Sequence, residues 1–363
     1  MSDPRFACPV WNPSTAHIDA VADWGRELLL PTSDPIEALR QPFSVAAVAA
    51  LCTQPGIWCH DPTITADVLR EFDLVLVSDP EYFDPARIVQ WCTDLGLKNY
   101  RVATSGQWAN QSLPDHFIYR PYFVRPFLDR NQSQDHGAKI KPYLFDVLLG
   151  ARRPHRDYVM LALDQTGLLE QSVVTYRDCF PGAVITEQNT EFQQLFPCVT
   201  LKWPYVSDHL DPAWEVADRI TNQISMIAPW EIYRRTWYSI VCETLSTGSG
   251  FFLSEKTIKA MYSRRVFVVF GPPGYLAWLR SHGFATFDGI IDESYDQEPR
   301  DAFRFRKAMA QVMQLAWFER PTDVYDWAQP RLDQNHRRLA EIETARTRDL
   351  AQQVKNSVGS HWR

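Results

Sequence analysis

The stretch that decides the fold covers residues 238–274 and reads YSIVCETLSTGSGFFLSEKTIKAMYSRRVFVVFGPPG. Its first apolar run predicts a strand ending at Cys242, and its second, residues 266–270, predicts another strand before a Gly-Pro-Pro-Gly turn. The segment after Ser254 predicts a helix between them. The order strand, loop, helix, strand predicts an α/β fold with parallel strands.

Two opposite charges, Glu255 and Lys256, open the predicted helix directly after Ser254, a residue type that caps helix N-termini. Ligands of open α/β sheets bind beyond the carboxyl ends of the strands, where this pair is expected. A carboxylate accepts hydrogen bonds from a ribose diol, and an ammonium gives phosphate oxygens a compact positive charge. The pair therefore suits a nucleoside diphosphate, but the spacing also fits an ordinary capped helix with two solvated charges.

The run from Cys242 to Gly271 resembles the donor-binding segment of the α-1,3-fucosyltransferases and their phage, viral and bacterial relatives. That family has an apolar strand, Glu-Asn or Glu-Ser, a loop with an aromatic residue, Thr-Glu-Lys, a helix, and a Val-Pro-Ile-type strand ending in Gly. This chain has Cys-Glu-Thr at 242–244, Phe252, Ser-Glu-Lys at 254–256 and Val-Phe at 266–267. It departs from the family at Thr244, at Phe252 in place of tyrosine, and at Phe267 in place of proline.

This resemblance implies a donor site in which Glu255 holds the ribose and Lys256 the diphosphate of a nucleotide sugar. The matching positions predicted to contact the donor are Glu243, Phe252, Glu255, Lys256 and Gly271.

Residues 141–176 resemble the opening of the same family's C-terminal domain, in which an arginine at a helix start contacts the donor pyrophosphate. Arg156 is the matching position, and Arg153 lies in the turn before it. The turn and helix start concentrate positive charge suited to a diphosphate: Arg152, Arg153, His155 and Arg156. A solvated basic loop is the alternative explanation.

The catalytic base is sought in the N-terminal half, where the family supplies it from a Glu-Ser-Pro on a loop after a strand. Here residues 57–63, IWCHDPT, take that place. Asp61 is the candidate base, with His60 as its substitute. An Asp-Pro pair is also a common turn element.

Two further candidates are expected to be structural. The acidic run at residues 292–296 could bind a metal or a sugar hydroxyl, but an exposed loop is favoured. His116 has no visible partner in the sequence and is expected to be structural or exposed.

With 363 residues the chain exceeds the usual size of one hydrophobic core, so more than one domain is expected. We predict an N-terminal acceptor-side α/β domain over residues 1–135, a nucleotide-sugar-binding α/β domain over 136–320, and a helical tail over 321–363. Residues 121–141 are polar and lose periodicity, as a linker does. The tail pattern predicts a helix over about 323–355 with a break or kink at Pro330.

Composition excludes several classes of protein. Hydrophobic residues make up 45% of the chain and aromatic residues 13%, which excludes disorder. No run approaches the roughly 18 apolar residues of a membrane span, and no signal peptide is expected. Seven cysteines without metal-type spacing fit a reducing, cytoplasmic compartment. A net charge of −7 disfavours a surface that embraces nucleic acid.

The resemblance implies two Rossmann-like lobes, the GT-B arrangement, and transfer of a sugar from a GDP-sugar or UDP-sugar to an acceptor hydroxyl. We expect inversion without a metal ion or cofactor, with Arg156 and Lys256 stabilising the leaving diphosphate. The acceptor is a glycan, a small molecule or a modified base in DNA, and the oligomeric state is not predicted. Two alternatives are a non-catalytic nucleotide-binding regulator and a DNA- or glycan-binding module, of which net acidity disfavours the second.

Overall fold

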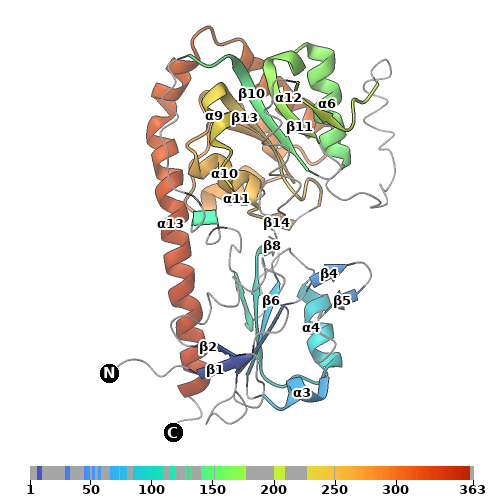
Figure 1. The fold of residues 1–363 in the computed structure, drawn as a ribbon, viewed down its shortest axis with the longest axis vertical. Coiled ribbons are helices and arrows are strands. Elements are labelled where there is room, and N and C mark those ends of the chain that lie inside the picture. The colour runs from blue at the N-terminus through green and yellow to red at the C-terminus, as the bar shows by residue number, and fades with distance from the viewer. Residues whose placement is uncertain are drawn as a thin grey trace. The chain divides into compact units, whose positions relative to one another are not determined.

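The computed structural model describes two compact units, formed by residues 1–126 with 340–363 and by residues 127–339 (Figure 1). We call them unit 1 and unit 2 and treat each by itself. The described backbone comprises residues 6–9, 29–32, 45–49, 51–53, 56–58, 66–72, 74–79, 85–108, 115–119, 124, 127–128, 131, 140–150, 152–176, 200–208, 227–248 and 250–359.

Unit 1 contains a parallel sheet with the strand order β3-β6-β7-β9, as the predicted α/β class requires. These strands are Val45–Ala49, Leu74–Asp79, Tyr100–Thr104 and Phe117–Tyr119. The other elements are β1 (Phe6–Pro9), β2 (Leu29–Thr32), β4 (Leu51–Thr53), β5 (Gly56–Trp58), α3 (Ala66–Arg70), α4 (Pro85–Asp94) and β8 (Gly106–Trp108).

The core of unit 1 lies between this sheet and its helices, with Val77, Ile88 and Val102 fully buried. Helix α4 ends at Asp94, and Gly96 shortly after it adopts a φ of +70°, which favours glycine. His116 does have a partner, which sequence reasoning missed: its Nε2 lies 3.2 Å from the Tyr100 hydroxyl.

Unit 2 is built on a five-stranded sheet with the order β12-β11-β10-β13-β15 (Figure 1). The strands are β10 (Tyr143–Leu149), β11 (Ser172–Tyr176), β12 (Tyr205–Val206), β13 (Thr236–Cys242) and β15 (Phe267–Phe270). All pairs are parallel except that of β12 with β11. The two strands predicted to end at Cys242 and to cover residues 266–270 are confirmed.

The helices of unit 2 follow the strands as an α/β fold requires. They are α6 (Pro154–Thr166), α9 (Trp230–Arg235), α10 (Glu255–Tyr262), α11 (Tyr275–Ser281), α12 (Asp301–Ala316) and the start of α13 (Pro321–Gly359). Short elements complete the unit: η1 (Leu169–Gln171), β14 (Gly250–Phe252) and η3 (Glu293–Gln297).

The side of the sheet on which successive strands are added changes between β10 and β13, although these two strands are parallel. From β10 the chain passes through α6 to β11 on one side, and it then returns past β10 to β13 on the other side. Such a change of side is a topological switch point, and ligands of open α/β sheets bind in the crevice beyond the carboxyl ends of the strands there.

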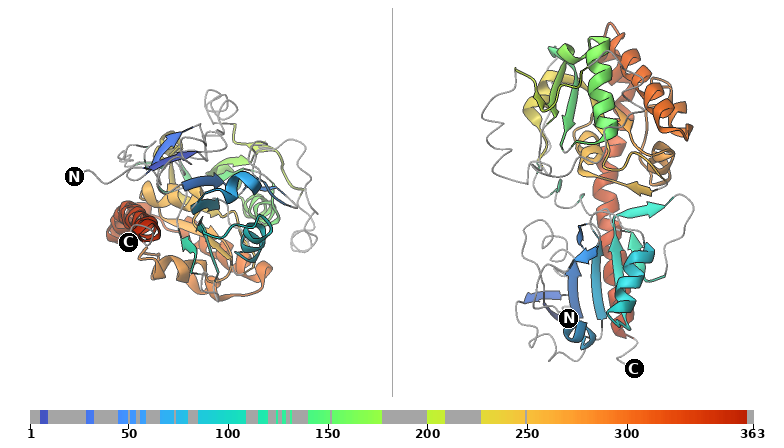
Figure 2. Two further views of the ribbon diagram at one scale, coloured as in Figure 1. Left: turned by 90° about the horizontal axis from the view of Figure 1, so that it is seen from below. Right: turned by 90° about the vertical axis from the view of Figure 1, so that its right-hand side faces the viewer.

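The core of unit 2 is apolar and closely packed around the sheet. Strands β13 and β15 are buried almost throughout, as parallel strands covered on both faces are. Helix α12 lies beside α6 (Figure 2). The centre of the Phe305 ring on α12 lies 6.2 Å from that of the Tyr158 ring and 6.0 Å from that of the Phe270 ring.

Helix α13 is continuous through Pro330, so the break predicted there is wrong. Proline removes one backbone donor, but the residues on both sides of it keep a regular buried stripe that holds the helix in register. That stripe consists of Val324, Ala328, Leu332, Asn335 and Leu339.

Candidate functional site

The candidate site lies at the carboxyl edge of the unit 2 sheet, where the ends of β10, β13 and β15 meet. Glu243 follows β13 directly, and its backbone N–H donates to the carbonyl of Phe270 at 3.1 Å. Gly271 follows β15, and α6 begins four residues after Gly150. The predicted donor-site residues of the two separate sequence segments are therefore carried on neighbouring strand ends.

His155 connects α6 to β13 across the switch point. Its Nε2 lies 3.0 Å from the carbonyl oxygen of Glu243, and its side chain is buried. Burial, followed by the positive charge of Arg156, holds the pKa of His155 well below its ordinary value. The ring is therefore neutral, and Nε2 carries the proton that it donates to the carbonyl.

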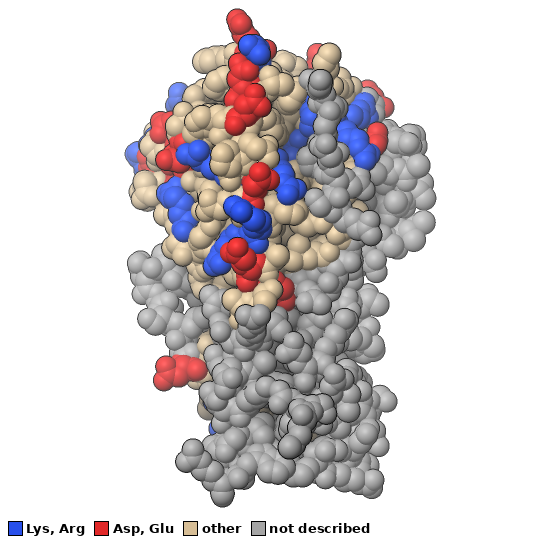
Figure 3. All heavy atoms as spheres, turned by 90° about the vertical axis from the view of Figure 1, so that its left-hand side faces the viewer, with Lys and Arg blue, Asp and Glu red and all other residues tan. Residues whose placement is uncertain are grey.

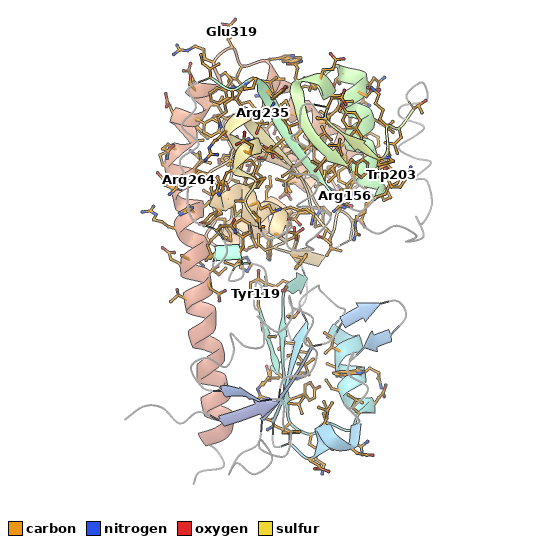
Figure 4. The ribbon with its side chains drawn as sticks, viewed as in Figure 1. Tyr119, Arg156, Trp203, Arg235, Arg264 and Glu319 are labelled. Carbon is orange, nitrogen blue, oxygen red and sulfur yellow. The ribbon has the colours of Figure 1, made fainter. Side chains whose placement is uncertain are left out.

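Arg156 is the third residue of α6 and is only 3% exposed (Figure 4). Burial raises the pKa of the Cys242 thiol to about 12, and the charge of Arg156 acts in the opposite direction. The N-terminus of α6 has no side-chain cap, so its helix dipole adds to the positive potential there.

The positive cluster expected at this turn is smaller than the sequence indicates. Arg152 is paired, with its Nε 3.0 Å from Asp157 Oδ2 and its guanidinium 5.1 Å from the centre of the Trp203 ring. Asp157 also accepts a hydrogen bond of 2.6 Å from the Tyr176 hydroxyl. His155 is neutral, Arg153 is exposed and Arg156 is buried.

Glu255 and Lys256 lie at the start of α10, with Ser254 as the predicted N-cap accepting from the Lys256 backbone N–H. Lys256 Nζ lies 2.5 Å from Glu255 Oε1 and 3.1 Å from Thr244 Oγ1. The side chain of Lys256 is 18% exposed and that of Glu255 is 14% exposed, so the alternative of two solvated charges does not hold.

The Glu255 carboxylate is charged despite its partial burial. Burial alone would raise the pKa of Glu255, but the neighbouring Lys256 ammonium and its hydrogen bond more than offset this, and the pKa lies below its ordinary value. The site thus holds an anion and a cation side by side at a helix N-terminus.

The Glu243 side chain is 1% exposed and holds three elements together. Its Oε1 accepts from the Tyr275 hydroxyl at 2.9 Å and from the Thr257 hydroxyl, and its Oε2 accepts from the Thr244 backbone N–H at 3.0 Å. The carboxylate therefore fixes the end of β13 to the first turn of α10 and to α11.

Phe252 and Gly271 are buried beneath these side chains. The Phe252 ring is 3% exposed, and its carbonyl oxygen lies 3.3 Å from the Tyr275 hydroxyl. A Cβ at Gly271 would lie 3.3 Å from the Tyr275 ring, so glycine allows that ring its close approach. Direct contact of these two residues with a donor stays a prediction.

Arg304, on α12, is a residue of the site region that the sequence analysis does not single out. Its buried guanidinium donates to the carbonyls of Ser246 at 2.6 Å, Gly271 at 3.0 Å and Glu298 at 3.0 Å. It thereby holds the loops after β13 and β15. The signal in the sequence is an arginine among apolar residues, beside Phe305.

The acidic run at 292–296 is less exposed than expected. Asp296 is buried, and its carboxylate accepts from the backbone N–H groups of Leu276 at 2.8 Å and Ala277 at 3.0 Å, which caps α11 from a distant segment. Asp292 is exposed, as predicted, and accepts from the backbone N–H of Ser294. These acids complete helix ends, and the described residues contain no cluster of His, Cys, Asp and Glu able to hold a metal ion.

The predicted catalytic residues Asp61 and His60 lie outside the described residues. Basic and acidic side chains are interspersed on the face of unit 2 drawn in Figure 3, unlike the continuous basic stripe used for duplex binding. Among the helices that the structure describes, none is long and apolar enough to cross a membrane.

Comparison with known proteins gives similarity at the level of solved structures. No family model matches the chain, and no curated protein matches its sequence. A crystal structure of an α1,3-fucosyltransferase is similar over 87% of this chain and 81% of that chain, with 10% identity and a TM-score of 0.39. A crystal structure of an α1,3-fucosyltransferase with GDP-fucose is similar over 88% of this chain and 83% of that chain, with 9% identity and a TM-score of 0.41.

Proposed function

We propose that unit 2 binds a nucleoside diphosphate sugar at the carboxyl edge of its sheet and that the protein transfers the sugar to an acceptor hydroxyl. The observation that carries this proposal is the pair Glu255 and Lys256, fixed side by side at the start of α10 and partly buried. Such a pair offers an acceptor for a ribose diol beside a cation for phosphate.

Two cations from different segments serve the diphosphate in this proposal. Lys256 supplies a compact charge from α10, and Arg156 supplies a buried guanidinium from α6, on the other side of the switch point. The open N-terminus of α6 adds its dipole to their field. In a nucleotide sugar the negative charge lies on the diphosphate, between the ribose and the sugar. The two cations therefore contact the diphosphate in this proposal, and Glu255 binds the ribose on one side of it.

The reaction breaks the bond between the anomeric carbon and the diphosphate oxygen and forms a bond from that carbon to the acceptor oxygen. The negative charge that develops on the diphosphate falls to Lys256 and Arg156, without a metal ion. Preorganised donors of this kind are worth about 3 kcal/mol each in the transition state. The acceptor proton goes to a base on the opposite face of the sugar, for which Asp61 is the candidate and His60 its substitute, so the transfer inverts the anomeric centre.

The sugar and acceptor are defined less narrowly than the reaction. The fucosyltransferase-like motif favours a GDP-sugar, and a UDP-sugar is the second choice. The acceptor is a hydroxyl of a glycan, a small molecule or a modified DNA base.

The test is a thermal-shift screen of the full chain against GDP, UDP, CDP, dTDP and their sugars. We expect one nucleotide to stabilise the protein, and Glu255→Ala and Lys256→Ala to abolish the shift. Lys202→Ala is the matched control, because Lys202 also forms a lysine–carboxylate pair, with Asp164 at 2.7 Å, but at the far end of α6. No shift with any nucleotide would overturn the proposal, and tight binding without transfer would favour the nucleotide-binding regulator.

A further inference from the structure

Thr244 occupies the turn that connects the end of β13 to the Lys256 side chain. Its hydroxyl oxygen accepts a hydrogen bond of 3.1 Å from Lys256 Nζ, while its backbone N–H donates to Glu243 Oε2 at 3.0 Å. The ammonium of Lys256 is thus held from two sides, by a neutral hydroxyl and by the carboxylate of Glu255.

The two partners of Lys256 have opposite consequences for an incoming phosphate. Glu255 attracts the ammonium strongly and cancels much of its field, since the two groups are 2.5 Å apart. A hydroxyl holds the ammonium without neutralising it. Because Thr244 is the second residue after β13, its bond draws the ammonium toward the carboxyl ends of the strands.

We infer that Thr244 is a positioning residue that holds the Lys256 ammonium in place for the diphosphate of the donor. This inference rests on the proposed function and assigns part of the affinity for the diphosphate of the donor to one hydroxyl group. Thr244 acts through Lys256, and it is the position at which this chain departs from the amide or serine of the fucosyltransferase motif.

The buried carboxylate of Glu243 keeps Thr244 and Lys256 within bonding distance of each other. One of its oxygens fixes the Thr244 backbone, and the other accepts from the hydroxyl of Thr257 in the first turn of α10. The same oxygen accepts from the hydroxyl of Tyr275 on α11. The strand end and the helix start therefore share one rigid anchor, and Glu243 acts on the site through these neighbours.

The experiment compares Thr244→Val, which keeps the shape but removes the hydroxyl, with Thr244→Ser, which keeps the hydroxyl. For the diphosphate that binds the wild type, GDP or UDP, we expect about tenfold weaker affinity in the valine variant and affinity within about twofold of wild type in the serine variant. Affinity for the matching nucleoside, guanosine or uridine, is expected to stay unchanged in both. Isothermal titration measures the diphosphate, and ligand-observed NMR measures the nucleoside.

Thr166→Val is the matched control, because it removes a threonine hydroxyl that bonds to the Ala162 carbonyl at 2.7 Å near the far end of α6. Unchanged diphosphate affinity in Thr244→Val would overturn the inference, as would equal weakening of nucleoside and diphosphate together with a lower melting temperature. If Lys256→Ala abolishes diphosphate binding while Thr244→Val leaves the affinity unchanged, the proposed function stands and this inference fails. If the wild type binds no nucleotide, both fail.

Discussion

Unit 2 contains two close ion pairs at opposite ends of its sheet, and their surroundings give them different roles. Arg265 precedes β15 at the amino end, and its Nη2 lies 2.7 Å from Asp146 Oδ2, with side-chain exposures of 0% and 4%. Glu255 and Lys256 lie at the carboxyl end, 2.5 Å apart, with exposures of 14% and 18%. The distance between the charged atoms does not distinguish the two pairs.

The difference lies in the further partners of each pair. The Arg265 guanidinium also donates to the carbonyls of Tyr233 and Thr236 and to the Ser239 hydroxyl, and Asp146 Oδ2 accepts from the hydroxyls of Thr236 and Ser239. Both buried charges are thus satisfied within the fold. The pair at the carboxyl end is partly exposed, and its cation has the Thr244 hydroxyl as its other partner. The first pair serves the fold, and the second is suited to exchange partners with a ligand.

The largest effect is expected at the amino-end pair. Asp146→Asn leaves the Arg265 charge buried without its counter-ion, so the free energy of unfolding should fall by about 3–5 kcal/mol. Glu255→Gln should lower it by less, because the Lys256 ammonium keeps the Thr244 hydroxyl as a partner and is 18% exposed. Urea denaturation followed by tryptophan fluorescence measures both values. The opposite order would contradict the assignment of the two pairs.

A double variant sharpens the same contrast. Replacing both members, as in Asp146→Leu with Arg265→Met, removes the charges together and should recover much of the stability lost in Asp146→Asn. If the double variant is as unstable as the single one, the loss comes from packing and hydrogen bonds rather than from an unpaired charge.

The next effect is expected in turnover at the carboxyl-end pair. Lys256→Met keeps the length of the side chain but removes the charge that the proposed diphosphate leaving group requires. Turnover should fall by about two orders of magnitude, while the free energy of unfolding should fall by less than in Asp146→Asn, because the Glu255 carboxylate left behind is partly exposed. Initial rates with the donor identified by thermal shift measure the first quantity. Lys202→Met is the control, and a rate equal to wild type in Lys256→Met would remove Lys256 from the mechanism.

The sequence predicts the local part of this site and misses the long-range part. The Ser254 cap, the charges after it and the strands on either side are encoded within a few residues, and the structure has them. Arg265 and Asp146 are 119 residues apart in the chain, and Asp296 caps a helix that starts 21 residues before it, so no local pattern reports either contact.

Charge state is a second quantity that the sequence predicts poorly. His155 and Arg152 belong to a basic run, yet one is neutral because it is buried and the other is paired with Asp157. Whether a cation in a turn is available to a ligand depends on such partners, which only the folded structure brings together.

The smallest effect is expected in the pH dependence of stability, and it separates the fold from the donor site once more. The folded-state pKa of His155 lies well below its unfolded value of about 6.5, so below that pH the unfolded chain binds a proton that the folded chain does not. Stability should therefore fall as the pH is lowered through 6.5, with a contribution from His155 of up to about 1.4 kcal/mol per pH unit.

His155→Gln removes this titration while keeping a side-chain N–H that can donate to the Glu243 carbonyl. The difference in unfolding free energy between wild type and variant should be constant above pH 7. Between pH 6.5 and 5 the wild type should become less stable relative to the variant. Parallel curves would mean that the pKa of His155 is the same in the folded and the unfolded chain. The pKa of Glu255 is lowered, so its contribution to the carboxyl-end pair is lost only as the pH falls below about 4.5. The affinity for a nucleotide sugar should then stay level between pH 8 and 5 while the fold weakens, because the group that titrates, His155, hydrogen-bonds to a backbone carbonyl rather than to the donor.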